Sequence, residues 1–84
     1  SGAVSFVERS LPDEYAGRRL DELACGDDYR PVMVTRAGAA RLATPSTMGQ
    51  EGDVVLFAVR ADAVPAFESR LGAVGANGAV GPTA

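Results

Sequence analysis

The strongest constraint on the fold is an uninterrupted apolar run, Val54–Val59. The run is rich in β-branched residues and contains no Gly or Pro, which predicts a central strand buried on both faces of a sheet. Just before it, Gly52 and Asp53 form a turn signal, because Gly tolerates positive φ and an Asp carboxylate accepts hydrogen bonds from backbone amides two residues on. We therefore expect the chain to turn there, with Asp53 serving the fold rather than chemistry.

Alternating apolar residues and turn residues predict the other elements. The expected strands cover residues 4–9, 32–36 and 41–44, with a hairpin turn at 37–40, and the expected helices cover 20–24 and 63–71. Asp62 is expected to cap the second helix, and Pro65 to lie in its first turn. The order β-α-β-β-β-α predicts a single small α+β domain at residues 4–71 with a mostly antiparallel four-stranded sheet. Residues 72–84 are rich in Gly and Ala, which predicts a flexible tail or linker.

The composition argues against several classes of function. The chain of 84 residues contains no histidine, and its one cysteine, Cys25, has no partner for a disulfide or a zinc site. We interpret Cys25 as a small buried apolar residue. All eight basic residues are arginines, so a Schiff-base lysine is excluded together with the histidine-assisted nucleophiles. We expect no enzymatic activity and no metal centre, and the net charge of −3 argues against nucleic-acid binding.

Three acidic pairs remain as candidates for chemistry: Asp13-Glu14, Asp21-Glu22 and Asp27-Asp28. The members of each pair are neighbours in the sequence and lie in predicted loops or on a helix surface. We therefore interpret them as solvated surfaces rather than as a catalytic dyad. A weak cation site at Asp27-Asp28 is the alternative for the last pair.

The sequence also bears on location. No stretch approaches the roughly 18 continuous apolar residues that a membrane-spanning helix needs, so direct insertion into a membrane is not expected. The chain begins Ser1-Gly2-Ala3, without the basic and apolar segments of a signal peptide. We expect a cytoplasmic location.

Two segments carry a resemblance to a known family. Residues 15–23 read Y-A-G-R-R-L-D-E-L, residues 45–56 read P-S-T-M-G-Q-E-G-D-V-V-L, and a strand and turn at 29–38 join them. In this order the segments resemble the TrkA C-terminal domain, also called the RCK C-terminal domain. That domain is a cytoplasmic regulatory module of bacterial potassium channels, potassium uptake systems and cation/proton antiporters. The resemblance covers roughly residues 4–71, which is the whole predicted fold.

The resemblance implies a homodimer that binds a small regulatory ligand between two copies and passes the change to a membrane-embedded transporter partner. In several members of the family the ligand is cyclic di-AMP, held by a segment similar to L-R-x-x-Y-G-x-N. On this chain the segment places the candidate ligand-binding residues at Tyr29, Arg30, Pro31 and Val32. Only Tyr29 matches the pattern, because the arginine position falls on Gly26 and the asparagine position on Pro31 or Val32.

Two alternatives stay open. An Arg30 side chain can meet a phosphate with two parallel hydrogen bonds, or it is an ordinary exposed arginine with no ligand. The whole chain is either a ligand-sensing dimer or a purely structural module that holds two larger subunits together. The chain lacks a G-x-G-x-x-G fingerprint, so the dinucleotide-binding half that often precedes this kind of domain is not part of it.

Overall fold

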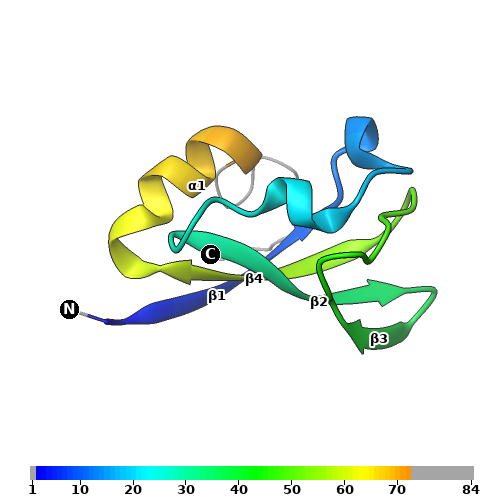
Figure 1. Ribbon diagram of the computed structural model, residues 1–84, viewed down its shortest axis with the longest axis horizontal. Coiled ribbons are helices and arrows are strands. Elements are labelled where there is room, and N and C mark those ends of the chain that lie inside the picture. Colours follow the sequence, from blue (N-terminus) through cyan, green and yellow to red (C-terminus); the bar gives the residue numbers. More distant parts are fainter. Residues whose placement is uncertain (1, 73–84) are drawn as a thin grey trace.

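The four strands of the protein form one sheet in the order β1-β4-β2-β3, and every neighbouring pair is antiparallel (Figure 1). The structure is a computed structural model and describes residues 2–72. The strands are β1 (Val4–Ser10), β2 (Tyr29–Arg36), β3 (Ala39–Leu42) and β4 (Val54–Arg60). The predicted α+β class, the antiparallel sheet and the central position of the apolar run are thereby confirmed. The tail predicted at 72–84 lies outside the described residues except for Gly72.

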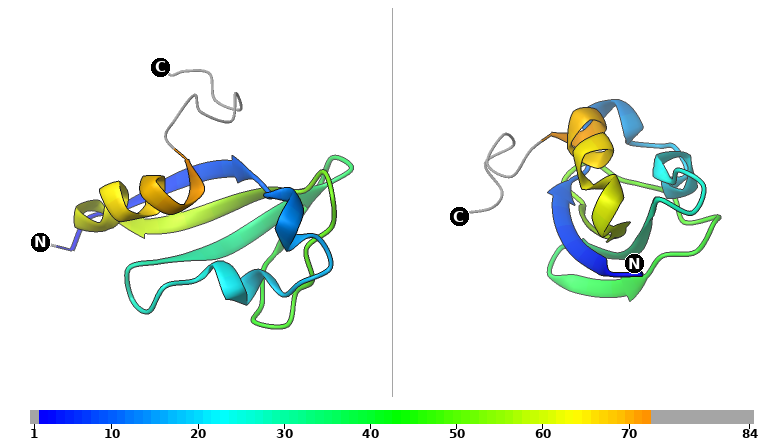
Figure 2. Two further views of the ribbon diagram at one scale, coloured as in Figure 1. Left: turned by 90° about the horizontal axis from the view of Figure 1, so that it is seen from above. Right: turned by 90° about the vertical axis from the view of Figure 1, so that its left-hand side faces the viewer.

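Helical segments cover one face of this sheet. They are three short 3₁₀ helices, η1 (Asp13–Tyr15), η2 (Leu20–Leu23) and η3 (Ala61–Ala63), and one α-helix, α1 (Val64–Leu71). In Figure 1 they lie above the sheet, and Figure 2 shows α1 over the β1–β4 half while η2 lies beside β2. Among the described residues no helical segment covers the opposite face, which we call the open face.

Burial in β4 alternates, so the prediction of a strand buried on both sides is wrong. Val55, Phe57 and Val59 point towards the helices and are buried, whereas Val54, Leu56 and Ala58 are only partly buried. Both sets are apolar, so the sequence run gives no sign of which face is covered. The strand is central in the sheet, but only one layer of helices packs on it.

The core lies between the sheet and the helical layer. Phe67 of α1 is fully buried, and its ring meets Phe57 and Tyr29 edge-on at centroid distances of 5.0 and 5.2 Å. Such edge-to-face pairs contribute beyond their buried area. The expected apolar face of α1 is confirmed, because Val64 and Leu71 pack against the same core. The buried apolar residues are Leu11, Leu20, Leu23, Tyr29, Val34, Val55, Phe57, Val59, Ala63 and Phe67.

Three local predictions need correction. The helix expected at 20–24 is a 3₁₀ helix, because the segment is too short for α-helical bonding to develop. Asp62 does not cap α1; its carboxylate accepts a hydrogen bond from Arg60 at 3.1 Å, whereas Pro65 lies in the first turn as predicted. Cys25 is exposed rather than buried, because the turn after η2 carries it outward.

Strand β2 begins at Tyr29, before the predicted start at residue 32, and it includes Pro31. Proline cannot donate to a ladder, so it is tolerated at bulges and strand edges. Both conditions hold here: the register with β4 shifts between Pro31 and Met33, and β3 pairs with β2 only from Met33 onward. The bulge therefore lies within the segment proposed for ligand binding.

Replacing Gly49 by Ala should destabilise the fold. A Cβ there would lie 2.8 Å from Leu11 Cδ2 and 3.1 Å from Leu20 Cδ2, and both leucines belong to the core. Overpacking of this kind costs about 1–3 kcal/mol, which lowers the melting temperature of a small domain by roughly 5–20 °C. Gln50→Ala is the control, because that side chain is exposed. Equal melting temperatures for the two variants would contradict the packing described here.

Candidate functional site

The structure does not gather the four predicted site residues into one pocket. Tyr29 pairs with Val59 and lies on the helical face, where it is buried, while Arg30 is exposed and pairs with Ala58 on the open face. Pro31 and Val32 are partly buried at the bulge. Because neighbouring residues of a strand point to opposite faces, this segment can offer a ligand one face at a time.

Tyr29 is used inside the fold. Its hydroxyl accepts a hydrogen bond from Arg70 Nη1 at 3.3 Å, and Arg70 Nη2 donates to the carbonyl oxygen of Glu22 at 2.8 Å. Hydrogen bonds to Tyr29 and Tyr15 raise the pKa of Arg70 above its ordinary value. Tyr29 thus links the end of α1 to β2, while Arg70 extends the link to η2.

Arg30 is the charged member of the predicted site. Its Nη2 donates to the carbonyl oxygen of Gly26 at 3.2 Å, across the turn that leads into β2. The side chain stays exposed, so a phosphate can reach the guanidinium group without displacing any core residue. Arg30 is exposed, as both alternatives require, so the choice between a phosphate-binding and an ordinary surface arginine stays a prediction.

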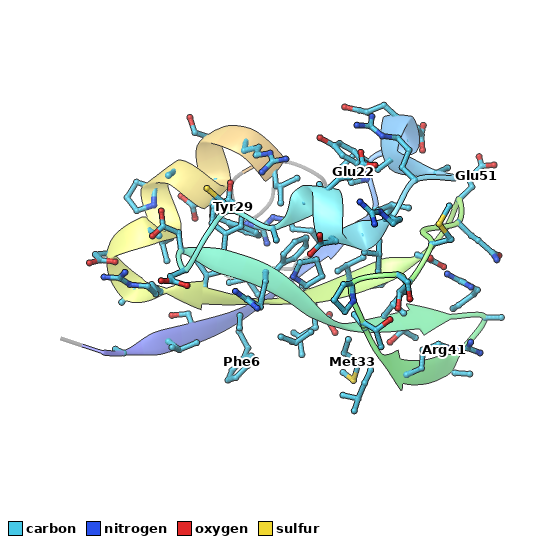
Figure 3. The ribbon with its side chains drawn as sticks, viewed as in Figure 1. Phe6, Glu22, Tyr29, Met33, Arg41 and Glu51 are labelled. Atoms are coloured by element: carbon cyan, nitrogen blue, oxygen red, sulfur yellow. The ribbon has the colours of Figure 1, made fainter. Side chains whose placement is uncertain are left out.

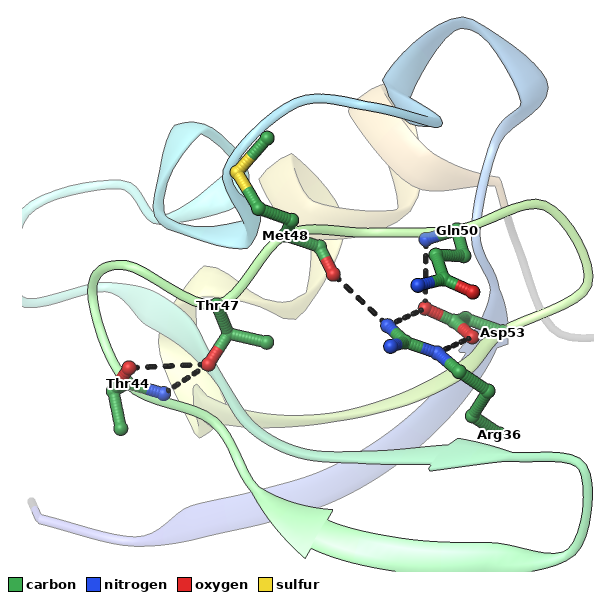
Figure 4. A network of polar contacts seen from close by, with 6 residues as sticks. All are labelled: Arg36, Thr44, Thr47, Met48, Gln50 and Asp53. Carbon is green, nitrogen blue, oxygen red and sulfur yellow. Dashed lines mark hydrogen bonds and ion pairs between the residues drawn. The ribbon is translucent and has the colours of Figure 1, made fainter.

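A buried ion pair that the sequence analysis missed holds the turn before β4 (Figure 4). Arg36 Nε and Nη2 donate to the two carboxylate oxygens of Asp53 at 2.8 and 2.7 Å, and Nη2 also donates to the carbonyl oxygen of Met48 at 2.9 Å. The backbone amide of Gln50 donates to Asp53 Oδ2 at 2.8 Å. The structural role predicted for Asp53 is confirmed. The amide that donates to it, however, lies three residues before it, whereas the sequence suggested an amide two residues after it.

The pair also sets the ionisation of Asp53. The hydrogen bonds from Arg36 hold the pKa of the carboxyl below its ordinary value of 3.8, and the amide of Gln50 acts in the same direction, whereas burial opposes both. The pKa of Arg36 is raised by the same contact. No signal in the sequence alone reveals the pair, because it depends on the antiparallel register, which aligns Thr35 with Val54 and so places Arg36 beside Asp53.

A fully buried arginine, Arg9 on β1, was also not predicted from the sequence. It is 1% exposed, and its Nε donates to the carbonyl oxygen of Gly72 at 3.0 Å, at the end of α1. Its guanidinium carbon lies 5.4 Å from the centre of the Phe67 ring. A cation is favourable at the C-terminal end of a helix and over an aromatic face. Arg9 therefore links β1 to α1, and we assign it a structural role.

Two surface hollows lie away from the predicted site. One, of about 300 Å³, is lined by Gly2, Ala3 and Arg60–Asp62, and the other, of about 390 Å³, is lined by Ser10–Glu14 with Arg70 and Leu71. Neither is lined by Tyr29, Arg30, Pro31 or Val32. Within residues 2–72, no three His, Cys, Asp or Glu side chains come together as metal ligands. In the Asp27-Asp28 pair, which was the alternative cation site, Asp28 Oδ1 lies 3.8 Å from Arg60 Nη1.

The open face carries several large apolar side chains that are exposed to solvent. Phe6 is 66% exposed, Leu42 is 78% exposed and Val4 is 50% exposed. The register aligns Glu8, Leu56, Met33 and Leu42 in one row across the sheet, and Phe6, Ala58 and Arg30 in the next row. Figure 3 shows Phe6 and Met33 pointing away from α1. Large contiguous apolar surfaces on small proteins usually mark a contact with another molecule.

Comparison with known proteins adds no family assignment. No family model matches the chain, and no curated protein matches it. The resemblance to the TrkA C-terminal domain therefore stays a prediction carried by the two segments at 15–23 and 45–56. None of the helices in the described part of the chain is long and apolar enough to cross a membrane.

Replacing Asp53 by Asn should lower stability in a pH-dependent way. Because the folded-state pKa is lowered, the charged Asp53 stabilises the fold fully above about pH 4, and this contribution is lost as the pH falls through the lowered pKa. At pH 7 we expect a loss of about 2 kcal/mol in the free energy of unfolding, typical of hydrogen bonds to a charged group. Urea unfolding at pH 7 and at pH 3 measures the difference, which should shrink at the lower pH. Asp13→Asn, at an exposed carboxylate, is the control; a difference from wild type that is the same at both pH values would rule out this role.

Proposed function

We propose that the chain is a dimerising regulatory domain of a potassium channel, a potassium transporter or a cation/proton antiporter, acting at the cytoplasmic side of the membrane. The observation that carries the proposal is the open face, an apolar sheet surface with one helical layer behind it and none in front within residues 2–72. The resemblance of residues 15–23 and 45–56 to the TrkA C-terminal domain supplies the class of partner. The α+β fold with an antiparallel sheet agrees with that resemblance.

Regulation in this proposal works through the arrangement of two copies. A ligand that binds more tightly to one arrangement of a dimer shifts the population towards it by its difference in affinity. The attached transporter then responds to the change in geometry, which is a coupling between two sites. The domain itself needs no catalytic group for this role.

Cyclic di-AMP is the ligand that the resemblance suggests, and Arg30 is the residue we expect to meet its phosphate. Arg30 is exposed on the open face, beside the bulge at Pro31 and Val32. Pro31 pairs with Phe57 and lies on the helical face, so Val32, at the bulge, is the member of the segment that offers an apolar contact close to this charge. Tyr29 lies on the opposite face of β2 and holds this strand in place, because its hydroxyl accepts a hydrogen bond from Arg70.

A purely structural dimerisation module is the second candidate. The observation that favours it is the burial of Tyr29, the one residue that matches the family's ligand segment. If Tyr29 serves packing alone, the segment carries no ligand signal beyond one exposed arginine. Dimerisation is common to both candidates, whereas a ligand effect belongs to the first alone.

Dimerisation is tested by sedimentation velocity on the full chain across a hundredfold range of protein concentration. We expect the sedimentation coefficient to rise with concentration from the monomer value to the dimer value. A chain that stays monomeric at the highest concentration contradicts both candidates.

Ligand binding is tested by thermal shift and calorimetry with cyclic di-AMP. For a ligand at about 100 times its Kd, binding adds about 2.7 kcal/mol to stability, which raises the melting temperature of a domain of this size by roughly 10 °C or more. Arg30→Ala should reduce the shift, whereas Arg19→Ala, which removes an exposed arginine near η2, should leave it unchanged. No heat and no shift for the wild-type chain would leave the structural module as the function.

A further inference from the structure

We propose that in the absence of ligand the open face is the surface on which a second copy of this chain docks, face to face, with Glu8 of each copy against Arg30 of the other. The inference rests on the proposed function, because it names the surface and the symmetry of the dimer. It follows from the apolar pattern of the face, its size and the position of its charges.

The centre of the open face is apolar and continuous across the strands. Leu56 on the central strand lies in register with Met33 on one side, and Met33 lies in register with Leu42 beyond it. The neighbouring row places Phe6 beside Ala58. These side chains are exposed or partly exposed in a single copy. A second sheet packed about 10 Å away would remove the side chains on β1, β4 and β2 from water, as in a β-sandwich, while Leu42 on the edge strand β3 stays at the rim.

The size of the face fits a dimer that dissociates on dilution. Strands β1 and β4 each contain 7 residues. At about 3.3 Å per residue and about 4.8 Å between strands, the three strands β1, β4 and β2 give a footprint of roughly 300 Å² on each copy. Side-chain relief increases the buried area, but the total stays at the low end of specific interfaces, below about 1,200 Å². Such an area supports a reversible contact rather than a permanent one.

Glu8 and Arg30 on the face are complementary to each other under one choice of two-fold axis, whereas Arg60, at the end of the same face, is already paired with Asp28 and Asp62. Glu8 is exposed on β1 and Arg30 is exposed on β2, and the central strand β4 lies between them. A two-fold axis that lies between the two sheets and runs along β4 places the β1 side of one copy opposite the β2 side of the other. Glu8 and Arg30 are offset by about 7 Å along the strands, a distance that a long arginine side chain can cover.

The other simple choice of axis is disfavoured by the same charges. An axis across the strands places β1 opposite β1 and β2 opposite β2. Glu8 of one copy then lies on the same side as Glu8 of the other, and Arg30 on the same side as Arg30. Like charges brought together at an interface reduce affinity and select against that register. The face therefore selects the axis along β4, and it forms two equivalent Glu8–Arg30 pairs at the rim of an apolar centre.

Sedimentation velocity on full-length charge-reversal variants tests the axis. Glu8→Arg and Arg30→Glu should each raise the dimer Kd about tenfold, because each creates two like-charge contacts per dimer. The double variant restores opposite charges and should return Kd to within about threefold of wild type, as a double-mutant cycle requires for a direct pair. The two single effects should weaken at high salt. Single reversals without effect, or a double variant with no recovery, would overturn the pairing.

Phe6→Glu tests the face itself, with Met48→Glu as the matched control. Both side chains are large, apolar and exposed, but Met48 lies in the loop beside η2, away from the open face (Figure 4). We expect Phe6→Glu to give a monomer at concentrations where wild type and Met48→Glu are dimers. Circular dichroism and melting curves confirm that each variant is folded.

The outcomes separate this inference from the proposed function. A wild-type chain that is monomeric at every concentration contradicts both. A dimer that Phe6→Glu and the charge reversals leave intact retains the proposed function but overturns the open face as its interface. The edge of β1 would then be the next surface to examine, because an edge strand offers unpaired backbone groups to another copy.

Discussion

The contact of Phe67 with the sheet is the interaction on which the rest of the structure depends. A helix of 8 residues covers little surface, so it must place its largest apolar side chain where strands β2 and β4 meet. Tyr29 and Phe57 receive the ring from the sheet, and Arg9 lies over it from β1. At the other end, the short helix η2 supplies the buried side chains of Leu20 and Leu23. Because the helical segments of residues 2–72 all lie on one face of the sheet, none of them covers the other face.

The number and order of the strands were predictable because their signals are local, although β2 begins before residue 32, and β3 covers Ala39–Leu42 instead of the predicted 41–44. The apolar run at Val54–Val59 and the turn at Gly52-Asp53 depend on neighbouring residues, and both elements are where the sequence placed them. The number of covered faces was not predictable, since an apolar residue facing solvent and one facing the core look the same in a single sequence. Coverage depends on how many helical residues the rest of the chain can provide.

The buried charges were not predictable for a different physical reason. Arginine and aspartate are expected at the surface, and they become buried where a partner from another strand satisfies them. Arg36 and Asp53 meet because β2 and β4 are antiparallel neighbours. At the candidate site, the sequence suggested four consecutive residues, but the strand geometry divides Tyr29 and Arg30 between two faces. A motif match in a strand therefore needs the register before it can be assigned to binding or to packing.

The pairing of β1 with β4 has a consequence for the order of folding. The partners Ser10 and Val54, and Val4 and Arg60, are separated by about 44 and 56 positions along the chain. Closing such a loop costs more entropy than forming the β2–β3 hairpin, so β1 is expected to join the sheet late. At a synthesis rate of about 5–20 residues per second, β1 waits several seconds on the ribosome for its partner strand. During that time Val7 and Arg9, which the folded protein covers, stay open to water in the nascent chain and are available to a chaperone.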